Sequence, residues 1–515
     1  MLRWRDRFRP VRPAWRSPPG TALLWGFSKQ ATRGWRPNIL KEIAPLTQDE
    51  RRAFIRVGAA RLPGEERAVR DADAVYRGVD ENTNDASKGT PLTVTTVKAL
   101  LNFAQPIPGF VYDKVDFDSE GEGRLDVAVR AHEQIRPRCC HCRKPCPGYD
   151  RLPGRRWRGV SLWNIVVWLY YAPRRVECPE HGVVVEYLPW SDGKRPWTVG
   201  MMAFLALWAR RLSWQDTARA FGVSWEAVFR SVEWTVEWGL KHRVLEGIRS
   251  IGVDELHWSR RKKGDGFLTV IYQIDAGMRR LLWVGPGRRE STLRAGLDAL
   301  GAEVIAGLEF VCSDMWKPYL KVIRERIAHA LHILDRFHIT SHLNEAVDQV
   351  RRREMNRLRQ QAPARASLLK RMRWSLLKKY SRVRGRARQR LDALIASKLP
   401  TARAHLLKEA FQHFWTYRSH PHALRFLEAW CQRAMRSRIE PMKKVARMLR
   451  RHQPLILNWF LAKGELSSGA VEGMNNKVRV ITRRAYGFRT FRALEVALYH
   501  NFARLPEPPR THKFC

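Results

Sequence analysis

The spacing of hydrophobic and polar positions changes several times along the chain and divides it into segments. Short apolar runs bounded by turn residues, such as residues 125–129 (LDVAV) and 162–172 (LWNIVVWLYYA), predict β-strands in the first half. Residues 198–243 change to helical spacing, residues 251–340 alternate strands with helices, and residues 341–465 are almost wholly helical. The pattern predicts a multidomain α+β protein.

The segment of alternating strands and helices has a recognisable order. Five strands are expected at residues 251–256 (IGVDEL), 267–275 (FLTVIYQID), 281–285 (LLWVG), 310–314 (FVCSD) and 329–334 (HALHIL). Three consecutive strands followed by alternating helix and strand is the order of an RNase H-like mixed sheet, in which the first and fourth strands are neighbours. We therefore expect Asp254 and Asp314 to approach each other.

Neighbouring carboxylates favour a divalent cation, because they repel each other and Mg²⁺ or Mn²⁺ accepts oxygen ligands. Glu472 offers a third carboxylate, on a helix that we expect to begin at a cap formed by residues 467–469 (SSG). Three such acids can hold two metal ions at a scissile phosphate. Each acid alone also fits a turn or a helix end, and Glu255, Asp275 and Asp335 compete for the same roles.

Glu472 is followed on its predicted helix by polar and basic residues at spacings of three or four. They are Asn475, Asn476, Arg479 and Arg483. This spacing predicts one helical face that combines a carboxylate, amides and cations. Such a face suits a strand of DNA that lies across an active site.

The charge balance indicates a polyanionic partner. The chain has 94 Lys and Arg against 50 Asp and Glu, a formal net charge of +44. Basic surfaces gain affinity for nucleic acid by releasing counterions, and a membrane surface or an acidic protein is the alternative. We expect no membrane span, because no apolar run reaches the roughly 18 residues that one requires. The eight cysteines are clustered, which favours a metal site in a reducing cytoplasm over a disulfide framework.

Residues with metal-ligand spacing form two pairs, Cys139 with Cys142 and Cys178 with His181. Two such pairs can close a tetrahedral zinc site that orders a small β domain. Cys140 and Cys146 could replace a member of the first pair, and reduced thiols without metal are the alternative. Between the pairs, residues 155–158 (RRWR) suit phosphate contacts or form a solvated loop.

Residues 213–234 carry the pattern of a helix-turn-helix. Gly222 permits a sharp turn, and Ser224 caps the helix that follows it. Trp225 and Arg230 lie on the expected outward face of this second helix, where base edges are read. An ordinary helical hairpin within a bundle is the alternative.

In these motifs the sequence resembles the DDE transposases of bacterial insertion sequences, and closely the ISL3 (ISL-three) family. The matching stretches are residues 139–158, 210–234, 252–258, 272–285, 313–320, 335–352 and 467–491. The resemblance covers roughly residues 100–505. It implies an RNase H-like fold with Asp254, Asp314 and Glu472 as catalytic acids that bind a divalent metal. It also implies structural zinc at the two ligand pairs already named.

The family further implies a substrate and a reaction. Double-stranded inverted-repeat ends would be bound, cleaved and joined to target DNA by a homo-oligomer of at least two protomers, on the nucleoid in a bacterial cytoplasm. An RNase H-like nuclease without strand transfer is one alternative. A catalytically decayed zinc-ribbon and helix-turn-helix DNA-binding protein is the other.

These expectations divide the chain into seven segments. They are a poorly ordered extension (1–95), a zinc-ribbon DNA-binding region (96–197), a helix-turn-helix (198–248), the first part of the RNase H-like core (249–340), a helical insertion (341–465), a catalytic C-terminal helix (466–505) and a tail (506–515).

Overall fold

The computed structural model describes residues 94–118, 123–162, 165–258, 266–462, 469–485 and 487–508. The predicted extension lies almost wholly outside the described residues, as do most of the predicted tail and the expected serine cap at 467–468. The chain divides into two units between residues 91 and 92, and everything described belongs to the second. No described helix is both long enough and apolar enough to cross a membrane.

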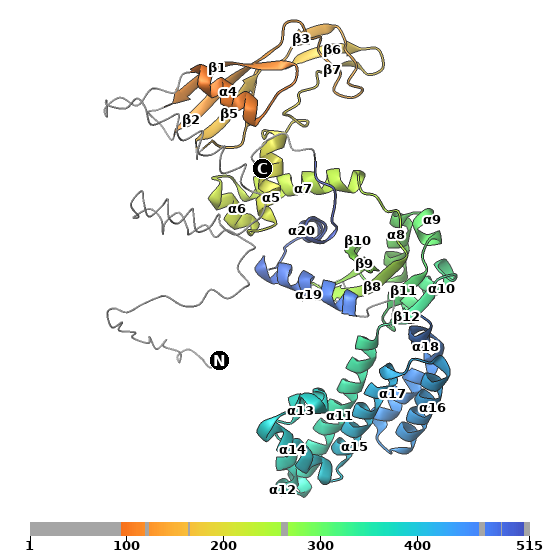
Figure 1. Cartoon of the computed structure of the whole chain (residues 1–515). Coiled ribbons are helices and arrows are strands. Elements are labelled where there is room, and N and C mark those ends of the chain that lie inside the picture. Colours follow the sequence, from red (N-terminus) through yellow and green to blue (C-terminus); the bar gives the residue numbers. More distant parts are fainter. Residues whose placement is uncertain are drawn as a thin grey trace, which may run out of the picture. The chain divides into compact units, whose positions relative to one another are not determined.

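The first part of this unit is built from two small sheets after helix α4 (Val94–Ala104) (Figure 1). One sheet has the order β1 (Phe110–Asp118), β2 (Arg124–Ala131), β5 (Val166–Tyr171), β4 (Arg155–Arg158). The other has the order β3 (Gly148–Arg151), β6 (Arg174–Cys178), β7 (Gly182–Val185). The strands expected within residues 125–129 and 162–172 are thereby confirmed, since they correspond to β2 and β5.

The basic-aromatic segment 155–158 is strand β4, so the expectation of a solvated loop is wrong. Trp157 is fully buried, and its indole N–H donates to the Ser191 hydroxyl at 2.9 Å. Arg158 donates to the backbone carbonyls of Phe221 and Gly222, at 3.0 and 2.8 Å. The guanidinium of Arg158 is therefore engaged inside the protein, where it binds the end of a helix from the next segment.

The helical segment comprises α5 (Val199–Ala209), α6 (Trp214–Ala220) and α7 (Trp225–Lys241). The expected turn and cap between α6 and α7 are confirmed. Gly222 has a φ of +56°, which glycine adopts without strain, and the Ser224 hydroxyl accepts a hydrogen bond from the Ala227 N–H at 3.1 Å. Val228 and Val232 are completely buried on the inner face of α7.

The central sheet has five strands in the order β10 (Met278–Pro286), β9 (Phe267–Asp275), β8 (Ser250–His257), β11 (Phe310–Ser313), β12 (Leu331–Leu334). The neighbours β8, β11 and β12 are parallel, and β8, β9 and β10 are antiparallel. The predicted adjacency of the first and fourth strands is confirmed. On one face lie α8 (Glu290–Leu300), α9 (Ala302–Ala306) and α10 (Lys317–Arg326), and on the other α19 (Gly469–Arg484) and α20 (Phe491–Phe502).

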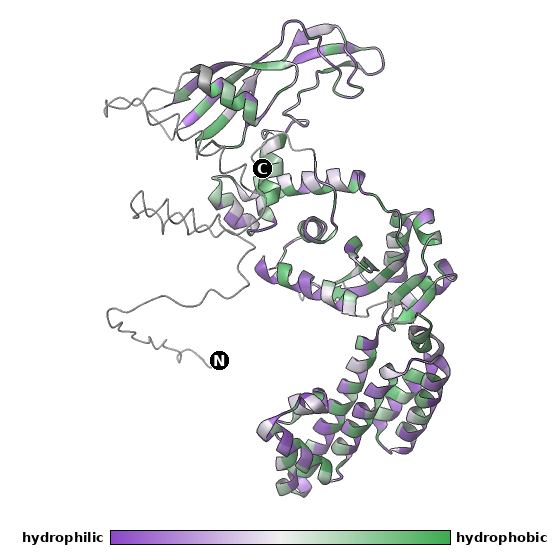
Figure 2. Ribbon diagram, in the orientation of Figure 1, coloured by the Kyte–Doolittle hydropathy of each residue, from purple (hydrophilic) through white to green (hydrophobic). Residues whose placement is uncertain are grey.

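Helices α11 to α18 form the predicted helical block around a core of their own. Their bounds are α11 (Arg336–Gln361), α12 (Pro363–Ala366), α13 (Arg373–Leu377), α14 (Gly385–Ala396), α15 (Pro400–Phe411), α16 (His420–Arg436), α17 (Glu440–Arg451) and α18 (Gln453–Leu461). Figure 2 shows hydrophobic and hydrophilic positions side by side along these helices, as expected of amphipathic helices around a shared core. The Asn458 side chain donates to the His332 carbonyl at 2.7 Å, so α18 is bound to β12.

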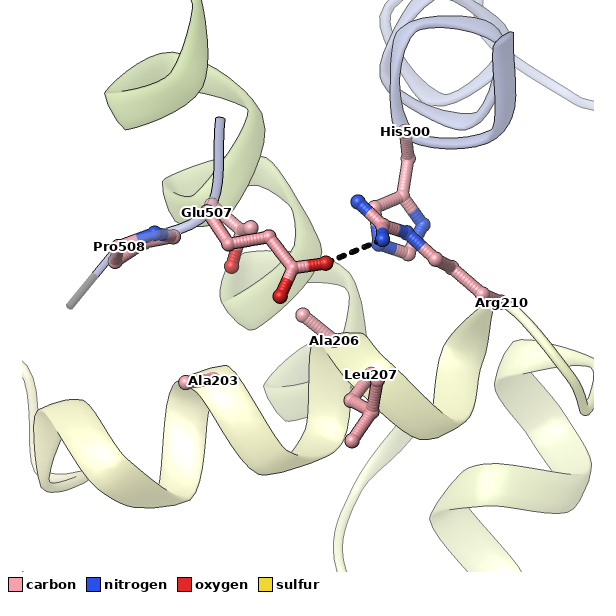
Figure 3. A pocket seen from close by; sticks show the side chains of 8 residues that line it. Ala203, Ala206, Leu207, Arg210, His500, Glu507 and Pro508 are labelled. Carbon is pink, nitrogen blue, oxygen red and sulfur yellow. Dashed lines mark hydrogen bonds and ion pairs between the residues drawn. The ribbon is translucent and has the colours of Figure 1, made fainter. Parts of the chain in front are cut away.

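A small cavity of about 30 Å³ lies beside α5 and α20 (Figure 3). Arg210 donates to Glu507 at 2.5 Å across it, and burial lowers the pKa of His500 to about 3, so this imidazole is neutral. The Arg210–Glu507 pair therefore joins the C-terminal segment to the end of α5.

Candidate active site and zinc centre

Three aspartates lie in one row across the parallel strands of the central sheet. In the strand register, Ser313 of β11 pairs with Val253 of β8 and with Leu334 of β12. The residues that follow these three are Asp254, Asp314 and Asp335. The Asp335 N–H donates to the Ser313 carbonyl at 2.9 Å, which continues the register past the end of β12.

Burial and mutual repulsion raise the pKa of all three carboxyl groups. Asp254 is 6% exposed, and burial is the largest cause of its raised pKa. Burial, with a further contribution from the charge of Asp254, raises the pKa of Asp314 to about 6. Burial also raises the pKa of Asp335, and the charge of Glu472 adds to this effect. The row concentrates negative charge in a place where water stabilises it poorly.

His338 faces this row from the first turn of α11. Its Nε2 lies 3.8 Å from Asp254 Oδ1, and its charge, when present, lowers the pKa of each of the three aspartates. Asp335 also caps α11, because its carboxylate accepts a hydrogen bond from the Phe337 N–H at 2.8 Å. The four residues 335–338 (DRFH) thus supply both an acid and a base to one site.

Helix α19 reaches the row because Gly252 has no side chain. A Cβ at Gly252 would lie 2.4 Å from Val471 Cγ2 of α19, closer than carbon atoms approach. Gly252 and Asp254 are two residues apart on one strand and therefore point to the same face. The glycine thus lets α19 lie directly over the strand that carries Asp254. Glu472, the residue after Val471, is half-buried at the start of this helix.

Asn475 of α19 is bound to the row instead of facing solvent. Its Nδ2 donates to Asp254 Oδ2 at 2.5 Å, and its Oδ1 accepts a hydrogen bond from the Tyr272 hydroxyl at 3.0 Å. Asn475 is 5% exposed. The predicted polar face of α19 is therefore divided, since Asn476, Arg479 and Arg483 are exposed.

The predicted zinc ligands form a compact group. Cys142 Sγ lies 3.7 Å from Cys178 Sγ, and His181 Nδ1 lies 3.8 Å from Cys139 Sγ and 3.5 Å from Cys178 Sγ. Zinc–sulfur bonds of about 2.3 Å place tetrahedral ligands about 3.8 Å apart, so these atoms fit around one zinc ion. A hydrogen bond to His181 is the largest cause that lowers the pKa of Cys178, to about 6, which favours the thiolate that zinc binds.

The predicted zinc ligands and the predicted catalytic acids differ in how closely their side chains gather. Within the described ranges, Cys139, Cys142, Cys178 and His181 are the one group of three or more residues that could hold a metal ion, and their ligand atoms all lie within 4.8 Å of one another. Cys140 and Cys146, the alternative ligands, are outside this group. Asp254, Asp314 and Glu472 form no such group among the described residues.

The predicted base-reading residues lie at the start of α7. Trp225 is 43% exposed and stacks on Phe229, with ring centroids 5.5 Å apart and planes 8° apart. Arg230 is paired with Glu226 at 3.3 Å and with Glu233 at 2.9 Å. Two acidic partners therefore compete with DNA for its guanidinium. The remainder of α7 packs against α20 and the C-terminal segment, so only its first turns are open.

Sequence reasoning missed three features of this site. Asp335 was expected only as a competitor for the catalytic roles, whereas it completes the row of aspartates. His338 and Tyr272 were not singled out. The sequence DRFH (335–338), directly after an apolar strand, could have indicated Asp335 and His338. A parallel strand next to β11 ends at the same edge of the sheet as β11, so residues that follow the two strands lie close together.

Similar proteins are known. The family model of ISL3 DDE transposases, described as a transposase, matches residues 251–498. The chain is 30% identical over 411 residues to the transposase for insertion sequence element IS1557 of Mycobacterium tuberculosis, which spans 75% of this chain and 90% of that protein. It is 27% identical over 387 residues to the transposase for insertion sequence element IS1001 of Bordetella parapertussis, spanning 74% and 92%. A solved structure, the Drosophila P element transposase strand transfer complex, aligns with a TM-score of 0.34 and 9% identity over 61% of this chain and 93% of that one.

Proposed function

The chain belongs to the ISL3 family of DDE transposases, enzymes of phosphoryl transfer on DNA, and we propose that it cleaves the terminal inverted repeats of an insertion sequence and joins them to target DNA. One observation carries this proposal. In the strand register Asp254, Asp314 and Asp335 form one row, and α19 lies over β8, the strand of Asp254, with Glu472 in its first turn. Strand order and acid placement together support an RNase H-like catalytic domain with the helical block inserted before α19.

Within this site we assign the catalytic acids as Asp254, Asp314 and Glu472. Asp335 is a further acid of the same row; burial is the largest cause of its raised pKa, and the charge of Glu472 adds to it. Asn475 and Tyr272 hold the Asp254 carboxylate in place through two successive hydrogen bonds. The carboxylate that a metal would share with the DNA is therefore oriented before any substrate arrives.

The donor set fits Mg²⁺ or Mn²⁺, because it consists of carboxylate oxygens whose charge is buried and mutually repulsive. Asp254, Asp314 and Glu472 would hold these ions. When bound, two such ions neutralise the charge that develops on a phosphate during in-line displacement. The exposed residues of α19 (Asn476, Arg479 and Arg483) extend from this site and would contact the DNA backbone.

The proposed reaction is phosphoryl transfer performed twice at one site. Water first breaks a phosphodiester bond at the end of the element, which frees a 3′-hydroxyl. That hydroxyl then attacks a phosphodiester of the target, so that one P–O bond forms as another breaks and no covalent protein–DNA intermediate is needed. The chain contributes positioning and charge stabilisation to both steps.

DNA recognition is assigned to the other segments. We infer that zinc held by Cys139, Cys142, Cys178 and His181 orders the ribbon, and that the ribbon and the start of α7, with Trp225 and Arg230, contact the ends. At least two protomers would act together, one at each end of the element. The substrate places this activity on the nucleoid in a bacterial cytoplasm.

The test compares Asp254→Asn with Asp275→Asn in Mg²⁺- or Mn²⁺-dependent nicking of supercoiled plasmid. Asp275 lies at the end of β9, outside the row, and serves as the matched control. We expect Asp254→Asn to lose nicking while it still binds DNA, and Asp275→Asn to retain both. Full nicking by Asp254→Asn would refute the assignment. Joining of a labelled inverted-repeat end into plasmid separates a transposase from a nuclease that only cleaves.

A further inference from the structure

A groove of about 1020 Å³ runs between the helix-turn-helix and the end of α19. Its lining is aromatic and basic. One wall contributes Trp214, Arg219 and Trp225, and the other contributes Arg483, Arg484, Phe488 and Arg489. A volume of this size is at the upper end of what small-molecule ligand sites enclose, so the groove can hold more than a solvent cluster.

The aromatic wall includes an indole that stays partly exposed. Trp225 stacks on Phe229 with one face, and Trp214 is tilted against both, with centroids 5.6 and 5.5 Å away. Phe488 packs edge-on against Trp214 at 6.0 Å, which joins the two walls. Although Trp225 is held in this cluster, it remains 43% exposed. A fixed indole with an accessible face is a stacking platform for a nucleic acid base.

The cations of the groove are largely free of acidic partners. Arg483 and Arg489 are exposed, and neither is paired with an acid within the described part of the chain. Asp216 is the acid in the groove lining, and it is already engaged by Ser213 and Arg219. Arg484 donates to the Arg211 carbonyl and so ties the walls together. The groove therefore attracts anions and has an aromatic wall.

These features favour unpaired nucleotides over intact duplex. In a duplex the base faces are stacked inside, and proteins read it by inserting helices or strands into its grooves. Here the aromatic rings line a hollow of the protein, and only a base that has left its stack can enter it. The location also fits, because Arg483 lies 11 residues after Glu472 on α19, about 16 Å along the helix.

We propose that this groove binds unpaired nucleotides of the DNA end, with a base stacked on Trp225 and backbone phosphates at Arg483 and Arg489. The inference rests on the proposed function, since it assumes that DNA crosses α19. It also gives Trp225 a role different from reading base edges in the major groove, because the stacking contact uses the flat face of the indole and tolerates any base.

The experiment measures binding of the full chain to a fluorescein-labelled 12-nucleotide oligo(dT) and to a duplex of equal length. We expect Trp225→Ala to weaken single-strand binding roughly 5- to 150-fold and to weaken duplex binding much less. Trp225→Phe should restore most of the affinity, because it keeps a ring face. Trp374→Ala is the matched control, since Trp374 is 67% exposed on the helical insertion, outside the groove.

The salt dependence of single-strand binding tests the arginines of the groove. Arg489→Ala should reduce the slope of log affinity against log salt for the single strand by about 0.7, the value for one lost phosphate contact. Arg386→Ala, an exposed arginine of the insertion, should leave the slope unchanged. Thermal unfolding of each variant verifies that the fold is intact.

Equal weakening of single-strand and duplex binding by Trp225→Ala would overturn the proposal, as would unchanged binding of both. A change in self-association alone would mean that a second copy occupies the groove, and would overturn it too. Asp254→Asn separates the two proposals. It should abolish nicking and keep single-strand affinity, so nicking that survives in Asp254→Asn would count against the catalytic assignment alone.

Discussion

Replacing Gly252 by alanine tests how the helix that carries Glu472 reaches the sheet. The new Cβ would lie 2.4 Å from Val471 Cγ2 and 3.2 Å from Ile274 Cγ2. Ordinary carbon contacts begin at about 3.5 Å, so α19 must move outward by about 1 Å. Overpacking of this kind costs about 1–3 kcal/mol of unfolding free energy.

The displacement should affect activity more than stability. Asn475 Nδ2 lies 2.5 Å from Asp254 Oδ2, and an outward shift of about 1 Å stretches this contact to the limit of a hydrogen bond. Glu472 moves with the same helix. Because a misplacement of about 1 Å can cost roughly 100-fold in rate, we expect plasmid nicking to fall by about two orders of magnitude. The melting temperature should fall by only several degrees, since about 1 kcal/mol corresponds to about 2–4 °C in a domain of this size.

The double variant Gly252→Ala/Val471→Ala removes the closest clashing atom and should recover part of the nicking. The two substitutions are in contact, so their effects should differ from additivity by about 0.5–3 kcal/mol. Gly473→Ala is the matched control, because its added Cβ meets nothing within 4 Å. If Gly252→Ala nicks plasmid like the wild type, or if the Val471 change brings no recovery, the close approach of α19 does not control the site.

Three further variants probe other parts of the molecule. Cys178→Ser should lose bound zinc, measured by elemental analysis, whereas Cys146→Ser should keep it; zinc retained by Cys178→Ser would exclude the assigned ligand set. The pKa of Asp314 is about 6 when folded, above its unfolded value near 3.8, so its stabilising contribution is present below pH 4 and lost as pH rises to 6. Without Mg²⁺, the free energy of unfolding from denaturant titrations should therefore fall between pH 4 and pH 6 by up to about 3 kcal/mol less in Asp314→Asn than in the wild type. An unchanged pH profile would contradict the raised pKa. Asn475→Ala should reduce nicking about 10- to 100-fold while the exposed neighbour change Asn476→Ala does not, and equal losses would show that Asn475 has no special role in orienting its aspartate.

The fold of the catalytic segment was predictable because each of its strands and helices is indicated by residues that are neighbours in the sequence. Apolar runs identified each strand, and the order of strands and helices sufficed to predict that β8 and β11 are neighbours. Asp254 and Asp314 were thus expected together, and the structure places them in adjacent register positions.

Other features depend on contacts between distant segments, which periodicity does not encode. The burial of Asn475 follows from how closely α19 approaches β8, and that distance is set by Gly252. Arg158 was expected to face solvent or phosphate, but it binds carbonyls at the end of α6, in another segment of the chain. The groove beside Trp225 likewise exists only because residues more than 250 positions apart form its walls.

Helix α11 joins the candidate active site to the helical block. It begins directly after Asp335, and its 26 residues extend about 39 Å into the helical block. Its apolar side chains, among them Leu343 and Val347, belong to the core of that block. Asp335 and His338 are therefore held at the start of a helix whose following turns pack in the core of the helical block. We expect a truncation within α11 to disturb the candidate active site, because it removes the core contacts that hold this helix in place.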